Sequence, residues 1–161
     1  MKKKKVMLKI ARTELQMLFY SPVAWLILVA FAVQCGMTFT EIMKGYVMNQ
    51  AMGYGVNGAS LSTFGGWSGL FTTMQGNLYF YIPLLTMGMV SRELSSGSIR
   101  LLYSSPISNR QIILGKFLSL MGYGLCLMGI LLIFMICGLF TIRAFDLPAV
   151  ISGWLGLYLL M

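Results

Sequence analysis

The sequence has few charged residues and no histidine. Of its 161 residues, 10% are charged and 58% are hydrophobic, and the mean hydropathy is +0.80. A soluble domain carries about 25% charged residues, so these charges are too few to cover a water-facing surface. An integral membrane protein is therefore the expected class. The absence of histidine excludes imidazole metal sites, Ser-His-Asp triads and histidine general bases.

Carboxylates and cysteines are scarce as well. Four carboxylates are too few for a carboxylate-based metal cage; they are Glu14, Glu41, Glu93 and Asp146. An odd number of cysteines inside apolar runs argues against a disulfide framework; they are Cys35, Cys126 and Cys137. We interpret these cysteines as small apolar packing residues.

Four apolar segments are candidates to cross a bilayer, whose core of about 30 Å needs about 20 helical residues. They are 21–40, 70–90, 117–142 and 148–161. The last would reach only about 21 Å, and a terminal carboxylate at that depth is costly. Either this helix is interfacial or the sequence is a fragment, and we favour the fragment. The predicted fold is an all-α integral membrane protein with about four transmembrane helices, the last incomplete. Residues 1–20 are predicted to form an amphipathic helix along the membrane interface.

Basic residues alternate between the connectors. Segments 1–22, 41–69, 91–116 and 143–147 hold six, one, four and one of them. The positive-inside rule then places the N-terminus and 91–116 in the cytoplasm and the other two connectors outside. Most of the net charge of +8 is thus assigned to topology and no nucleic acid partner is expected. The glycine-rich segment 41–69 is predicted to be a flexible or partly re-entrant outer loop.

The lysine run Lys2–Lys5 is expected to anchor the topology and to attract anionic membrane lipid, at about 1 kcal/mol for each charge. Chemical energy is expected to come from a partner, because no G-x-x-x-x-G-K-[ST] motif occurs. Gly115-Lys116-Phe117 lacks the upstream glycine and the hydroxyl residue of that motif. No acid stands inside a predicted span to relay protons. Neither an enzymatic activity nor a cofactor is expected.

The cytoplasmic connector 91–116 is the most informative segment. It contains apolar residues between charged ones, and Ser105-Pro106 would end a helix there. One interpretation is a short surface helix, held between two membrane helices, that transmits a push from a cytoplasmic partner. The other is a solvated loop that only carries inner-side charge.

Motifs along most of the chain, from about residue 8 to the end, resemble the type-2 ABC transporter permease family. The resemblance is closest to the branch that includes gliding-motility and copper-nitrous-oxide-system permeases. The sequence departs from many relatives at Gly88, where they carry arginine. The motifs that carry the resemblance are Glu14-Leu15, Phe19-Tyr20-Ser21-Pro22, Thr86-Met87, Arg92-Glu93, Ser96-Gly97-Ser98-Ile99, Leu101-Leu102, Ser104-Ser105-Pro106-Ile107-Ser108 and Ile113-Leu114-Gly115-Lys116-Phe117.

The resemblance implies a permease half built on a six-helix fold, which dimerises with itself or a second permease subunit and pairs with separate ABC ATPase subunits. It implies an exporter of the bacterial plasma (inner) membrane that works by alternating access. The segment after the second span would be the coupling helix seated on the ATPase, through Arg92, Glu93, Gly97, Ile99, Leu102 and Pro106. A non-transporting membrane assembly or structural protein is the alternative.

Overall fold

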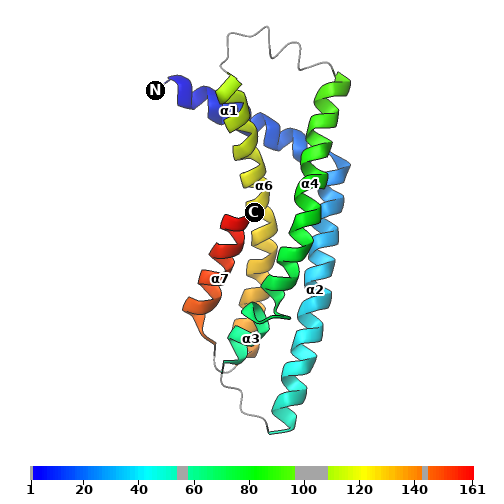
Figure 1. Ribbon diagram of the computed structural model, residues 1–161, viewed down its shortest axis with the longest axis vertical. Coiled ribbons are helices and arrows are strands. Elements are labelled where there is room, and N and C mark those ends of the chain that lie inside the picture. The colour runs from blue at the N-terminus through cyan, green and yellow to red at the C-terminus, as the bar shows by residue number, and fades with distance from the viewer. Residues whose placement is uncertain (1, 54–57, 97–108, 143–144) are drawn as a thin grey trace. The chain divides into compact units, whose positions relative to one another are not determined.

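Every regular element in the computed structural model is an α-helix over the residues it describes, which are 2–53, 58–96, 109–142 and 145–161 (Figure 1). This architecture fits the all-α membrane protein that the composition predicted. The elements are α1 (Lys2–Phe19), α2 (Pro22–Ala51), α3 (Ala59–Gly65), α4 (Leu70–Ser96), α6 (Asn109–Thr141) and α7 (Leu147–Leu160).

The chain divides into two compact units, and three long helices contribute to both. The first unit contains Met1–Ile27 and Tyr81–Leu125, and the second contains Leu28–Phe80 and Cys126–Met161. Each unit has its own buried residues. The division therefore separates α1, with the helix segments it contacts, from the unit that contains α3 and α7.

In the first unit, α1 is amphipathic and packs by its apolar side. Ala11 and Leu18 are buried, whereas Lys9 and Arg12 on the other side are exposed. Residues three and four apart lie on one face of a helix, which is why this spacing separates a buried side from a wet one. The segment of α2 that belongs to this unit buries Ala24 and Ile27.

In the second unit, the buried ring of Phe64 from α3 is the centre of an aromatic cluster. Its centroid lies 5.6 Å from that of Phe71, 5.7 Å from that of Phe145 and 6.5 Å from that of Phe39. Aromatic pairs at 4.5–7 Å contribute beyond their buried area, by about 0.5–1.5 kcal/mol each. The cluster thus fixes the short helix α3, which also contacts α7.

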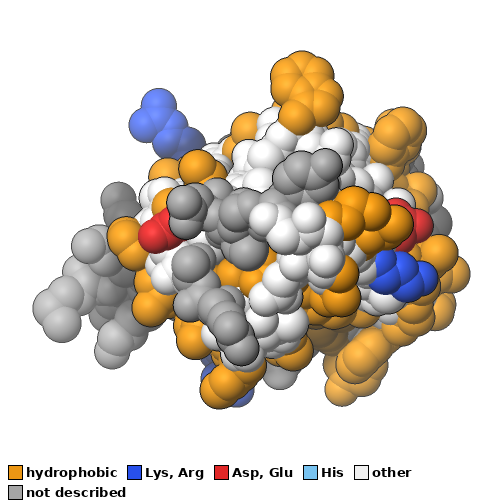
Figure 2. Space-filling view, turned by 90° about the horizontal axis from the view of Figure 1, so that it is seen from below, with side chains coloured by type: hydrophobic (Ala, Val, Ile, Leu, Met, Phe, Trp, Pro, Cys, Tyr) orange, Lys and Arg blue, Asp and Glu red, His pale blue; other side chains and the backbone are white. Residues whose placement is uncertain are grey.

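Large apolar side chains remain on the outside of the two longest helices. Met37 in α2 is 64% exposed and Phe140 in α6 is 85% exposed, and many similar residues accompany them. The face in Figure 2 carries hydrophobic side chains with few charges between them. A water-soluble monomer rarely exposes so large an apolar area. Among the described residues, Pro22–Ala51 and Arg110–Thr141 are long and apolar enough to cross a membrane.

The other two predicted spans, α4 and α7, do not combine the length and the hydropathy of a membrane-crossing helix. Helix α4 is 27 residues long but carries Thr72, Gln75 and Asn77 in its first turns, and it contains Pro83. Helix α7 is apolar but has 14 residues. The helices α2, α4, α6 and α7 therefore overlap the four apolar segments predicted from the sequence, and α2 and α6 have the length and hydropathy of a full span.

Segment 41–69, predicted to be a loop, is mostly helical in the structure. Helix α2 continues to Ala51 and α3 occupies Ala59–Gly65, so most of this segment is helical. Good helix formers such as Glu41 and Lys44 extend α2. The helix ends just before Gly53, whose φ of 77° lies in the left-handed region that glycine adopts without strain. Glycine content predicted flexibility here, but the glycines lie mainly at helix ends.

Candidate functional site: the junction of α1 and α6

The residues predicted to couple to an ATPase lie mostly outside the described residues. Arg92 and Glu93 are in the last turns of α4, but their side chains are not among those described. The others, Gly97, Ile99, Leu102 and Pro106, fall in 97–108, outside the described ranges. The structure therefore does not test the coupling set. It does show the helices on either side of that segment, α4 ending at Ser96 and α6 beginning at Asn109.

Six residues into α6, Gly115 lies against α1. A Cβ atom added to Gly115 would be 2.7 Å from Ile10 Cγ2 and 3.1 Å from Ile10 Cβ. The first distance is shorter than carbon atoms tolerate and the second is a tight contact, since contacts are optimal at about 3.5–4.0 Å. One helical repeat later, Gly122 has Leu15 Cδ1 at 3.4 Å from the same construction. Gly115 and Gly122 thus form the surface of α6 against which α1 packs.

An ion pair accompanies this close packing. Lys116 Nζ lies 3.6 Å from Glu14 Oε1, and the two side chains are 24% and 18% exposed. Partial burial strengthens the attraction relative to a fully solvated pair. The pair also orients Glu14 toward α6, which leaves the opposite side of α1 without a carboxylate.

The corner between α1 and α2 is held by hydrogen bonds. Trp25 Nε1 donates to the Phe19 carbonyl at 2.8 Å, and the buried Tyr123 hydroxyl donates to the Ala24 carbonyl at 2.8 Å. The Phe19 ring lies 6.1 Å from the Trp25 ring and 6.0 Å from the Tyr123 ring, centroid to centroid. Helix α6 therefore contacts both the body of α1 and the start of α2.

The sequence motifs include both halves of this junction but do not predict that the two halves meet. Glu14-Leu15 and Gly115-Lys116 are about one hundred residues apart, yet both belong to the same junction. Glu14 pairs with Lys116, and Leu15 lies against Gly122, one helical repeat after Gly115. The sequence signals of this contact are Glu14-Leu15, within a basic helix, and Gly115-Lys116, at the start of an apolar helix. Opposite charges on Glu14 and Lys116 could have suggested that these two residues meet.

The described residues contain no group of three histidine, cysteine, aspartate or glutamate side chains able to hold a metal ion. The three cysteines do not gather: Cys35 is buried, whereas Cys126 and Cys137 are exposed. Cys35 Sγ instead contacts Met74 Sδ at 3.1 Å. This arrangement agrees with the packing role assigned to Cys35 and gives the exposed pair no shared site.

Comparison with protein families decides the class. The family model described as ABC-2 family transporter protein matches residues 8–158. The chain belongs to the ABC-2 transporter family. No curated protein and no solved structure matched the chain. The match includes both halves of the α1–α6 junction and the predicted coupling segment.

Membership in the ABC-2 family has several consequences. The chain is a multi-pass membrane protein and a permease component of an ABC transporter. ABC-2 permeases are in general non-catalytic membrane subunits, and the family implies partnership with an ABC ATPase subunit. The resemblance noted from the motifs is confirmed at the level of the family.

Proposed function

We propose that the chain is the permease subunit of an ATP-driven exporter, moving its substrate by alternating access while a separate ATPase supplies the energy. The family match over residues 8–158 is the observation that carries this proposal. The gliding-motility and nitrous-oxide-system branch is the proposed relationship within the family. The proposed setting is a bacterial inner membrane, with a homodimer or a second permease subunit completing the path.

The mechanism assigns the coupling role to 91–108, which joins α4 to α6. Nucleotide-driven closure of the ATPase would displace this segment and tilt the helices on either side. Because Gly115 and Ile10 are in such close contact, α6 cannot slide past α1 without separating from it. Under this proposal α1 and the first half of α6 therefore move as one body, and α1 carries the motion to the start of α2.

Co-purification tests the partnership. The chain is expressed with the P-loop ATPase tested as its partner, solubilised, and captured by a tag on the permease. Wild-type protein is expected to retain the ATPase, and Glu93→Ala or Gly97→Val is expected to lose it. Glu41→Ala is the matched control, because Glu41 is exposed in α2 and lies on the predicted outer side. Loss of the ATPase in all three variants, or in none, would contradict the coupling role of 91–108.

The alternative function makes a different prediction in the same experiment. A non-transporting assembly or structural protein would retain no ATPase even as wild type. If the wild-type complex forms but shows no ATP-dependent substrate movement in vesicles, the exporter mechanism is rejected while the partnership stands.

Thiol labelling tests the topology. The three native cysteines are replaced by alanine, and single cysteines are introduced at Ser98 or at Ser68, which is exposed between α3 and α4. A membrane-impermeant maleimide applied to intact cells is expected to label position 68 only. Applied to inverted vesicles it is expected to label position 98 only. Labelling of position 98 from outside the cell would reject both the topology and the coupling role.

Binding of anionic lipid at Lys2–Lys5 is also part of the proposal. Each lysine near a negatively charged membrane surface contributes about 1 kcal/mol, so four together would anchor the start of α1. Weaker flotation of a variant with all four lysines changed to glutamine, on vesicles containing phosphatidylglycerol, is the expected result.

A further inference from the structure

The side of α1 turned away from Gly115 and Lys116 carries a cationic stripe. Lys9 and Arg12 are three residues apart, and this spacing places them along one face of the helix. Lys9 and Arg12 are exposed, and no ion pair joins either to another described residue. Glu14, the acid of α1, instead pairs with Lys116 on the other side of the helix.

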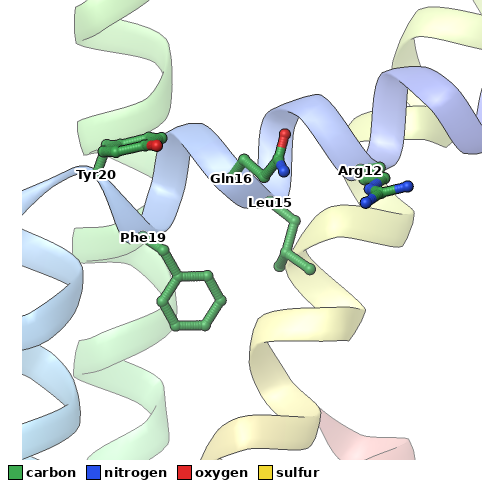
Figure 3. A pocket seen from close by; sticks show the side chains of 5 residues that line it. All are labelled: Arg12, Leu15, Gln16, Phe19 and Tyr20. Carbon is green, nitrogen blue, oxygen red and sulfur yellow. The ribbon is translucent and has the colours of Figure 1, made fainter.

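The stripe leads into a hollow of about 370 Å³ along the same helix. Its lining is Arg12, Leu15, Gln16, Phe19 and Tyr20 (Figure 3). In that view Leu15 and Phe19 point to the same side of α1, and Gln16 points to the other. The hollow therefore has an apolar wall and a polar edge that carries one guanidinium, one amide and one phenol group.

The position of the hollow in the chain matches the level of lipid headgroups. It ends at Tyr20, and α2 begins two residues later at Pro22 with the uncharged run 23–40. Tyr20 is 88% exposed and Trp25 is 56% exposed. Exposed tyrosine and tryptophan at the end of an apolar helix are typical of the membrane interface. From this pattern we expect the apolar wall to border hydrocarbon and Arg12 to lie among headgroups.

We propose that this hollow is a binding site for one anionic phospholipid. Arg12 pairs with the lipid phosphate, for which the planar guanidinium offers two parallel donors. The amide of Gln16 and the hydroxyl of Tyr20 donate hydrogen bonds to the headgroup, and Leu15 with Phe19 contacts the glycerol and upper acyl chain. The hollow is open and lined only by α1 and the adjoining Tyr20, which suits a lipid headgroup and glycerol lying along the surface of the helix. This site is separate from Lys2–Lys5 and does not depend on the proposed transport function.

Native mass spectrometry of the purified full chain in detergent tests the site. Dioleoyl-phosphatidylglycerol is titrated, and dioleoyl-phosphatidylcholine and free glycerol 3-phosphate serve as the comparison ligands. One molecule of phosphatidylglycerol is expected to bind in preference to phosphatidylcholine. Arg12→Gln is expected to weaken that binding about five-fold, the factor for one charge near an anionic headgroup. Tyr20→Phe, which removes only the hydroxyl, is expected to weaken it about two- to ten-fold.

Arg110→Gln is the matched control, because Arg110 is another exposed arginine and loses the same charge. It is expected to change phosphatidylglycerol affinity by less than about two-fold, since it is not part of the hollow. Equal weakening by Arg110→Gln and Arg12→Gln would overturn the site in favour of non-specific attraction. Equal binding of phosphatidylcholine would also overturn it, as would displacement of the lipid by glycerol 3-phosphate, which would indicate a soluble phosphate ligand.

Discussion

Replacing Gly115 with alanine is expected to loosen α1 from α6. The added methyl group would lie 2.7 Å from Ile10 Cγ2 and 3.1 Å from Ile10 Cβ. Isoleucine is branched at Cβ and has one strongly preferred side-chain rotamer in a helix, so Ile10 cannot rotate away from the new methyl. The two helices must instead separate, and overpacking of this kind costs about 1–3 kcal/mol.

A second alanine substitution isolates that cost. Glycine to alanine in a helix also gains up to about 1 kcal/mol from propensity, which would mask part of the loss. Gly129 lies in the same helix, and a Cβ atom there would meet nothing within 4 Å. Gly129→Ala therefore receives the same gain without the clash. The unfolding free energies of the two variants are expected to differ by about 1–3 kcal/mol.

The assay is unfolding in mixed micelles of dodecylmaltoside and sodium dodecyl sulfate, followed by tryptophan fluorescence. Ile10→Ala removes the clashing Cγ2 atom, so Gly115→Ala should cost at least about 1 kcal/mol less in that background, a coupling within the usual range for contacting residues. If Gly115→Ala is as stable as Gly129→Ala, or if Ile10→Ala brings no relief, α1 does not rest on Gly115 and the reasoning is refuted.

Three further substitutions test other contacts by the same measurement. Tyr123→Phe removes the hydroxyl that donates to the Ala24 carbonyl at 2.8 Å and should cost about 0.5–1.5 kcal/mol; Tyr158→Phe, whose hydroxyl bonds no described residue, should cost nothing measurable. Ser60→Ala removes the hydroxyl that accepts from the Asp146 backbone N–H at 3.1 Å. It should cost about 1 kcal/mol and speed amide hydrogen exchange at the start of α7, while Ser68→Ala, at an exposed serine between α3 and α4, should leave that exchange unchanged. Gly138→Ala would place a methyl group 2.6 Å from Phe64 Cζ and should cost about 1–3 kcal/mol of unfolding free energy. If this variant is as stable as Gly129→Ala, the Phe64 ring moves aside without cost and the prediction is wrong.

Much of the architecture could be predicted from composition and hydropathy. Long uncharged runs predict helices because a bilayer leaves backbone groups no other partner, and α2 and α6 contain two of those runs. The position of Pro22 at the start of α2 follows from its missing N–H. Helix ends were harder to predict: Glu41 and Lys44 are polar and suggested a loop, but both are good helix formers and α2 continues through them.

The α1–α6 junction could not be derived from local pattern. Gly115 in an apolar helix has many possible causes, and only a neighbour placed by the fold shows that a side chain there would collide with Ile10. Similarly, the sequence gives Lys116 only as one more basic residue on the predicted cytoplasmic side, whereas in the structure its Nζ lies 3.6 Å from Glu14 Oε1. The family resemblance identified these residues as characteristic, but it gave no partner for either of them. The predicted coupling residues remain a prediction for the same reason, because their contacts would be with another subunit.

The hydrogen bond from Tyr123 to Ala24 joins residues 99 positions apart, and this has a consequence for biogenesis. When α1 and α2 leave the ribosome, the surface on which α1 will rest has not yet been made. A nascent chain that stops short of residue 115 leaves α1 without Gly115 and Lys116, so the side of α1 that contacts α6 is open to the surrounding lipid. Release of α1 from that lipid onto α6 is then a late step of assembly, and nascent chains arrested before and after this point should differ in protease sensitivity at α1.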